Sequence, residues 1–234
     1  MKNPLDDGPF LVLDEVESTQ TVVADALRTG EPVGAVLALH QTRGRGRFDR
    51  EWISEPGASL NLSLAMAAYS DHGEPWLVGM AVAVAVAGAL HSELRWPNDL
   101  VLQGSKLGGI LVEIVEDSRG RRVPVVGIGV NLNQTTFPEP LAKIATSLAL
   151  HREGPFVPEE VARAILGRFA ETPEPESWQS LEAIWGLFDD TPGKHYRLTD
   201  GREAVALGIG PHGELLCSVA GESMTVLAAD AIFG

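Results

Sequence analysis

The segment RWPNDLVLQGSKLGGILVEIV, residues 95–115, decides the fold of this chain. Two short apolar runs, 94–96 and 99–102, precede a Gly-Ser turn and a longer apolar run at 106–115. Apolar runs of this length are typical of β-strands, and short turns join strands that lie antiparallel. The segment therefore predicts an antiparallel meander.

The longer run has an unusual composition for a strand. It opens with Lys106 and contains Gly108 and Gly109, although interior glycine weakens a strand. We interpret these residues as a place where a ligand presses against the backbone, with the lysine as a point charge beside it.

Further strands and helices flank this segment. Apolar or alternating runs predict strands, and amphipathic or alanine-rich runs that follow a capping residue or a proline predict helices. The expected strands are 10–16, 33–40, 59–66 and 123–130, and the expected helices are 21–28, 74–90, 159–170 and 177–187. The run at 59–66 alternates leucine or methionine with small or polar residues, which predicts one buried face. The expected fold class is α+β, a mixed β-sheet with packed helices.

The pattern changes near residue 189. Four short strand-like pieces, at 195–198, 203–210, 214–220 and 223–228, are separated by turns that contain glycine. The sequence thus predicts two domains, 1–188 and 189–234, the second a minimal β-barrel.

The composition excludes several classes of protein. A net charge of −14 makes a poor general nucleic-acid binder, because phosphate contacts need clustered lysine and arginine. The single cysteine, Cys217, excludes an internal disulfide framework and suits a reducing compartment. The start of the chain does not resemble a signal peptide, and the longest apolar stretch, 76–90, is shorter than the roughly 20 residues of a bilayer span. We expect a cytoplasmic protein without membrane contact.

Basic residues nevertheless gather in one place. Four arginines lie within eight residues, at positions 43, 45, 47 and 50, and alternate with glycines. Glycines let a backbone approach a ligand closely, and arginines neutralise phosphate. The window indicates a site for a small anion. The alternative is an Arg-Gly nucleic-acid segment, which is usually terminal, whereas this one lies between two expected strands.

Two other polar clusters, 17–20 and 95–99, have simple structural interpretations by themselves, a helix cap and a tight turn. The whole set is more specific. ESTQ (17–20), QTRGRGRFDREW (41–52), RWPNDL (95–100), KLGGILVE (106–113) and GIGVNLN (127–133) occur in one order. Together they closely resemble a bacterial biotin protein ligase of the monofunctional form.

The resemblance implies a biotin/lipoate ligase-like catalytic domain at 1–188 and an SH3-like β-barrel at 189–234. It implies an ATP-dependent, AMP-forming reaction in two steps. Biotin and MgATP give biotinyl-5′-AMP and pyrophosphate, and a lysine of the biotin carboxyl carrier protein or domain then attacks the adenylate. Only about nine residues precede the first expected strand, so we expect no DNA-binding role. A monomer and a homodimer both remain open.

The resemblance also assigns residues to roles. The catalytic set would be Lys106, Arg47, Arg45 and Asp99, with Asp99 also holding Mg²⁺. The biotin-binding set would be Ser18, Thr19, Gln20, Gln41, Gly44, Arg45, Gly46, Arg47, Lys106, Gly108 and Gly109. The ATP-binding set would be Arg47, Arg50, Trp52, Asn98, Lys106 and Asn131. Hydroxyl and amide groups suit the ureido group of biotin, and the cations offset the repulsion between a carboxylate and the α-phosphate.

Two residues depart from the pattern of that family. Gln20 stands where asparagine is usual, and Asp49 stands where the third loop glycine is usual. Two enzymatic alternatives therefore stay open, a lipoate or octanoyl ligase or transferase of the same fold and a weakly active biotin-binding paralogue.

Overall fold

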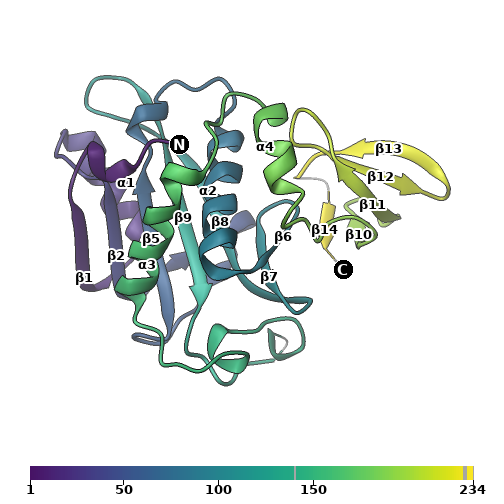
Figure 1. The fold of residues 1–234 in the computed structure, drawn as a ribbon, viewed down its shortest axis with the longest axis horizontal. Helices are drawn as coiled ribbons and strands as arrows, with labels where there is room; N and C mark the ends of the chain where they lie inside the picture. Colours follow the sequence, from purple (N-terminus) through teal and green to yellow (C-terminus); the bar gives the residue numbers. More distant parts are fainter. Residues whose placement is uncertain (140, 229–230, 234) are drawn as a thin grey trace.

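The protein, in a computed structural model that describes residues 1–139, 141–228 and 231–233, has a larger and a smaller part. The larger part is built on a seven-stranded sheet, and the smaller on a five-stranded sheet at one end of the long axis (Figure 1).

The large sheet has the strand order β1-β2-β5-β9-β8-β7-β6. Its strands are β1 (Phe10–Val16), β2 (Ala35–Gln41), β5 (Ser59–Ala65), β6 (Glu93–Arg95), β7 (Asp99–Leu102), β8 (Ser105–Glu116) and β9 (Arg122–Asn131). Strands β1 and β2 are parallel, and every other neighbouring pair is antiparallel. The mixed sheet and the antiparallel meander are confirmed.

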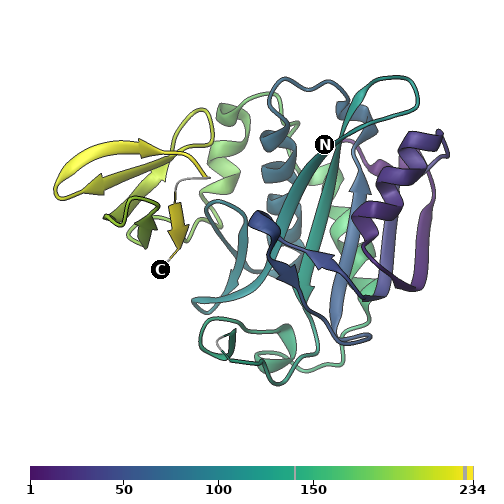
Figure 2. The ribbon, with the colours of Figure 1, turned by 180° about the vertical axis from the view of Figure 1, so that it is seen from behind.

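Helices cover both faces of this sheet (Figures 1 and 2). The α-helices are α1 (Thr19–Thr29), α2 (Pro75–Leu90), α3 (Pro158–Gly167) and α4 (Trp178–Trp185). Short 3-10 helices are η1 (Pro4–Asp6), η2 (Arg47–Asp49), η3 (Ala67–Tyr69), η4 (Leu141–Lys143), η5 (Leu148–Leu150) and η6 (Arg168–Glu171). Helix α1 lies on one face, whereas α2 and α3 pack on the other. The helix expected at 159–170 is shorter than predicted: α3 ends at Gly167, and the chain continues as the 3-10 helix η6.

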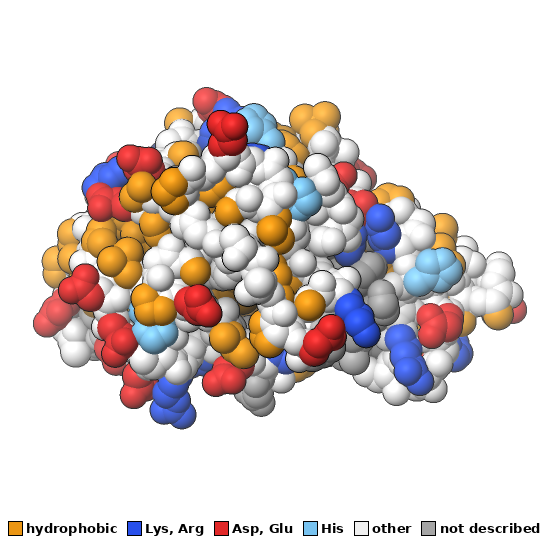
Figure 3. All heavy atoms as spheres, turned by 90° about the horizontal axis from the view of Figure 1, so that it is seen from below, with side chains coloured by type: hydrophobic (Ala, Val, Ile, Leu, Met, Phe, Trp, Pro, Cys, Tyr) orange, Lys and Arg blue, Asp and Glu red, His pale blue; other side chains and the backbone are white. Residues whose placement is uncertain are grey.

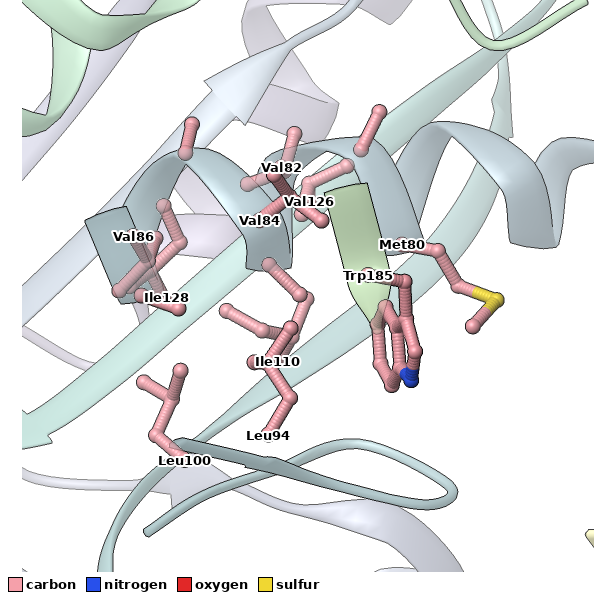
Figure 4. Packing of buried hydrophobic residues seen from close by; sticks show 14 of the residues in the cluster. Met80, Val82, Val84, Val86, Leu94, Leu100, Ile110, Val126, Ile128 and Trp185 are labelled. Carbon is pink, nitrogen blue, oxygen red and sulfur yellow. The ribbon is translucent and has the colours of Figure 1, made fainter. Parts of the chain in front are cut away.

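The hydrophobic core lies between α2 and the sheet (Figure 4). Val82 and Val86 of α2 face Val126 and Ile128 of β9, and all four side chains are almost completely buried. A helix that is apolar all round is stable only when it is buried on all sides. Burial therefore overrides the strand preference of its valines. No helix within the described ranges has the length and apolar character needed to cross a bilayer.

Strand β5 differs from the expected pattern of one buried face. All seven of its residues are buried, including the polar Ser59, Asn61 and Ser63. Their face is the one opposite α2, and it is covered by α1 and by the arginine-rich window. Alternation in a sequence identifies the two faces of a strand but not what covers the second one.

The smaller part has the strand order β13-β12-β11-β10-β14, all antiparallel. Its strands are β10 (His195–Leu198), β11 (Glu203–Ile209), β12 (Leu215–Val219), β13 (Glu222–Val226) and β14 (Ala231–Phe233). The expected all-β module is confirmed. In the described part of the chain, no pairing between β13 and β14 closes it into a barrel.

Trp96 joins the two parts of the molecule. Its backbone N–H donates to Thr191 Oγ1 at 2.9 Å, and its indole N–H donates to the carbonyl of Gly213 at 2.9 Å. The Tyr196 hydroxyl donates to the carbonyl of Trp96 at 2.6 Å, with the two rings edge to face. The turn that follows Trp96 is thus fixed by hydrogen bonds with the smaller part of the molecule.

Candidate active site

A cleft of about 560 Å³ opens on the α1 face of the large sheet. Its walls are the start of α1, the end of β2, the window at 42–51, and the segment at 133–145, of which residues 133–139 and 141–145 are described. We call these last two the arginine loop and the 133–145 segment. Strands β8 and β9 form its floor.

Part of the arginine loop has regular secondary structure. It contains a two-stranded ribbon in which β3 (Gly44–Arg45) pairs with β4 (Glu51–Trp52), and it crosses the sheet in Figure 2. A Cβ at Gly44 would lie 2.4 Å from the carbonyl oxygen of Trp52. Only glycine allows the two arms to approach this closely.

Buried hydroxyl and amide groups line one end of the cleft. Gln41 Oε1 accepts from the Thr19 backbone N–H at 2.8 Å and from Thr19 Oγ1 at 3.0 Å. Thr19 Oγ1 also lies 2.7 Å from Ser63 Oγ. Ser18 lines the cleft and makes no side-chain capping bond to α1, so its hydroxyl does not perform the cap role that sequence alone favoured.

Gln20 also lines this end of the cleft. Its Nε2 donates to the carbonyl of Leu111 at 3.4 Å, and a Cβ at Gly127 would lie 2.8 Å from its Cδ. The longer side chain of glutamine therefore rests on the floor of the sheet, in space that a glycine provides.

Charged groups converge at the other end. Lys106 Nζ lies 2.5 Å from Asp99 Oδ1, and Arg47 donates to Asn98 Oδ1 at 3.2 Å. Arg47 also donates to the carbonyl of Ala228, in the smaller part of the molecule, at 2.7 Å. Burial lowers the pKa of Arg47, partly offset by the charge of Asp99. A partly desolvated cation favours an anionic ligand, because water competes less for it.

The backbone of Lys106 is held by the 133–145 segment and the residue after it. Its N–H donates to the carbonyl of Ile144 at 2.7 Å, and its carbonyl accepts from the N–H of Thr146 at 2.8 Å. The side chain of Asn131 donates to the carbonyl of Thr146 at 2.9 Å. The sequence reading missed this wall, because the segment carries neither periodicity nor a charge cluster.

Two other arginines of the loop, Arg43 and Arg45, form ion pairs with glutamates. Arg45 pairs with Glu113 at 2.8 Å, and Arg43 pairs with Glu17 at 3.6 Å. These pairs border a second cavity of about 710 Å³, which Gly44 also lines.

Most of the expected site residues meet in the cleft. They are Ser18, Thr19, Gln20, Gln41, Arg45, Gly46, Arg47, Arg50, Trp52, Asn98, Asp99, Lys106, Gly109 and Asn131. Gly44 borders only the outer cavity. Gly108 borders neither, because a Cβ there would lie 2.2 Å from the carbonyl oxygen of Gly129. Its place in the binding set stays a prediction, and the structure shows it packed closely between β8 and β9.

Metal ligands, a cysteine and a basic surface would each point to another kind of protein, and the structure places these groups as follows. In the described residues no three metal-ligating side chains lie together. Cys217 is buried in β12 and does not line the cleft, and burial raises the pKa of its thiol. On the face seen in Figure 3, basic side chains lie scattered among acidic and apolar ones. The side chain of Asp49 lies outside the described part of the structure.

Comparisons with known proteins agree with this geometry. The model of the biotin/lipoate A/B protein ligase family matches residues 12–133. The bifunctional ligase/repressor BirA of Bacillus subtilis is 36% identical over 153 residues, which are 61% of this chain and 47% of that protein. The chain thus spans about half the length of such relatives.

Two other similar proteins are matched over most of their length. The biotin–[acetyl-CoA-carboxylase] ligase of Mycobacterium tuberculosis is 31% identical over 245 residues, 94% of this chain and 88% of that protein. The biotin protein ligase from Aquifex aeolicus in complex with biotin and ATP superposes with a TM-score of 0.74 at 25% identity, over 95% and 97% of the two chains.

Proposed function

The chain belongs to the biotin/lipoate A/B protein ligase family, and we propose that it is a biotin protein ligase that makes biotinyl-5′-AMP from biotin and ATP. It then transfers the biotinyl group to a lysine of a biotin carboxyl carrier protein or domain. The observation that carries the proposal is one cleft with buried hydroxyl and amide groups at one end and Lys106, Asp99 and Arg47 at the other.

The polar end suits the ureido group of biotin. That group offers one carbonyl and two N–H donors, and each would cost about 1–3 kcal/mol if it were buried without a partner. Ser18, Thr19 and Gln41 supply both donors and acceptors here. Gln41 and Thr19 are already fixed by each other, so little side-chain entropy is lost when biotin binds.

The charged end suits the reaction itself. In the first step a biotin carboxylate oxygen attacks the α-phosphorus, and pyrophosphate leaves. Two anions must approach each other, so Lys106 and Arg47 would stabilise both the encounter and the charge that develops. Arg45 would join them only after leaving Glu113, 2.8 Å away.

The nucleotide would lie toward β9 and the 133–145 segment. Asn131 and Asn98 are amide groups at this end, and Arg50 adds a cation. Mg²⁺ would enter as part of MgATP. Asp99 is one carboxylate, and a magnesium ion is often held by one or two carboxylates plus substrate phosphates.

The acceptor amine must reach the adenylate from outside. A lysine nitrogen forms the new amide bond with the biotinyl carbonyl, the bond to AMP breaks so that AMP leaves, and the amine releases its proton to water. Asp99 is the carboxylate beside the charged end and would take part in binding this amine. The cleft has no thiol, so an octanoyl transferase that uses a cysteine is not supported by any described residue.

Mass spectrometry of the products tests the proposal. The purified chain with ATP and biotin should give biotinyl-5′-AMP, whereas ATP with lipoate or octanoate should give no adenylate. Addition of a carrier domain should then increase the carrier mass by one biotinyl group, and a carrier with its acceptor lysine changed to arginine should stay unlabelled. Adenylation of lipoate in preference to biotin would contradict the proposal.

A further inference from the structure

The polar face of β5 lies beneath the walls of the cleft. Three of its side chains hold three different walls. Ser63 bonds Thr19 at the start of α1, and Ser59 accepts from Gln134 of the 133–145 segment at 2.5 Å. The central residue, Asn61, lies beneath the arginine loop.

The side chain of Asn61 joins both ends of that loop. Its Oδ1 accepts from the indole N–H of Trp52 at 3.0 Å and from Gln41 Nε2 at 3.3 Å. Ser54 Oγ lies 3.4 Å from the same oxygen. Gln41, the last residue of β2, directly precedes the arginine loop, and Trp52 is the first residue after the loop, so one oxygen of β5 binds the side chains at both ends of the loop.

Trp52 carries this restraint into the loop. It pairs with Gly44 in the β3–β4 ribbon, and its ring lies on Gly129, where a Cβ would come within 2.8 Å of the indole. The position of Trp52 bears on that of Gly44 because the two are backbone partners, and they lie so close that a Cβ at Gly44 would come within 2.4 Å of the Trp52 carbonyl oxygen. Arg45 and Arg47 follow directly in the chain.

We propose that Asn61 is a positioning residue for the ligation: its amide oxygen ties the two ends of the arginine loop to β5 and so places Arg45 and Arg47 at the cleft. The inference rests on the proposed function. Asn61 also lines the cleft, but both polar atoms of its side chain already have protein partners: the oxygen accepts from Trp52 and Gln41, and Nδ2 donates to the carbonyl of Ala38 at 3.3 Å.

Removal of this oxygen should release the loop. Asn61 is 1% exposed, so in Asn61→Leu the N–H groups of Trp52 and Gln41 would be buried without this acceptor. A buried N–H group without an acceptor is destabilising. If the two ends of the loop move toward solvent, water can accept these hydrogen bonds instead. Only the fraction of molecules with a placed loop then binds biotin well, and the apparent dissociation constant rises by the reciprocal of that fraction.

Two measurements test the inference. The KM for biotin of Asn61→Leu should rise about tenfold, the factor that corresponds to 1.4 kcal/mol, with a much smaller change in kcat. Trypsin should cleave after Arg43, Arg45, Arg47 or Arg50 faster than in the wild type, as identified by peptide masses. A variant that merely misfolds in part would lose kcat through a smaller active fraction and leave KM unchanged.

Further variants keep the inference falsifiable if Asn61→Leu folds poorly. Asn61→Asp keeps an acceptor oxygen and should recover part of the KM. Trp52→Phe removes only the N–H partner and keeps a ring, and its effect should be less than additive with that of Asn61→Leu, as for residues that act through one contact. Ile165→Val in α3, on the opposite face of the sheet, is the control for a modest loss of stability.

The outcomes separate the inference from the proposed function. A wild-type chain that forms no biotinyl-5′-AMP would overturn the proposed function, and the trypsin comparison would still report on the loop. An active wild type together with an Asn61→Leu variant of unchanged KM and unchanged loop cleavage would overturn the inference alone. Additive effects of Asn61→Leu and Trp52→Phe would also contradict it.

Discussion

Lys106 Nζ lies 2.5 Å from Asp99 Oδ1, across the turn between β7 and β8. The ion pair holds the ammonium at the charged end of the cleft, where the side chain of Lys106 is still 38% exposed. A cation held in this way is available to a ligand without first being ordered, which is the essence of electrostatic preorganisation.

Replacement of Lys106 by alanine should therefore affect the chemistry more than the fold. Loss of one placed charge at a transition state costs on the order of 10²–10³ in rate. We expect that loss in biotinyl-5′-AMP formation, with the thermal midpoint close to that of the wild type. Arg163→Ala, which removes an exposed cation from α3, is the matched control. Adenylation at the wild-type rate in Lys106→Ala would rule out this role.

Arg47 should retain the adenylate until the carrier docks. Its guanidinium lies between Asn98 and the carbonyl of Ala228 and would add a charge-assisted bond to phosphate, worth about 1.5–3 kcal/mol. Arg47→Gly should release biotinyl-5′-AMP roughly 10- to 150-fold faster. Because the free adenylate acylates exposed amines, a streptavidin blot of bystander albumin should become positive, while carrier labelling falls without disappearing. A clean blot with normal carrier labelling would disprove retention by Arg47.

Asp190 should make stability depend on acidic pH. Burial alone would raise its pKa, but hydrogen bonds from Lys194 and Arg95 outweigh burial and hold the pKa below its usual value. A depressed pKa in the folded state contributes stability above the unfolded value of about 3.9, and that stability is lost as the pH falls through the folded pKa.

The Asp190→Asn variant tests this dependence. Arg95 is 4% exposed, and its Nε and Nη2 both donate to Asp190 Oδ2. Removal of the carboxylate charge from this buried pair should be destabilising by about 3 kcal/mol. Urea denaturation should show that difference at pH 7 and a smaller one near pH 3. A difference that is equal at both values would mean that the ion pair contributes nothing through its charge.

Gly108 should behave as a packing residue and not as a binding residue. A Cβ in Gly108→Ala would lie 2.2 Å from the carbonyl oxygen of Gly129, so β8 and β9 must separate. Overpacking of this kind costs about 1–3 kcal/mol or more. We expect a lower thermal midpoint with an unchanged KM for biotin in the molecules that fold. A stable variant with weakened biotin binding would support the place of Gly108 in the binding set.

The sequence by itself determined the elements and most of the candidate site. Period-two and helical patterns predicted the strands and helices, because local burial repeats with the geometry of each element. The chemistry of Lys106, the arginine loop and Thr19 was visible because charge, glycine and hydroxyl groups were concentrated in short segments. The elements and the site residues could be predicted where the pattern that identifies them lies within one short segment of the sequence.

Only the tertiary structure decided what lies on the second face of each element. Asn61 was one polar residue in an alternating strand, and its partners come from β2 and β4. Gly108 and Gly109 are adjacent in sequence, yet only Gly109 lines the cleft, because successive residues of a strand point to opposite faces. The hydrogen bond from the Tyr196 hydroxyl to the carbonyl of Trp96 joins residues that are 100 positions apart in the sequence. Contacts between distant segments leave no periodic trace in either one, so they become known only when the fold brings the segments together.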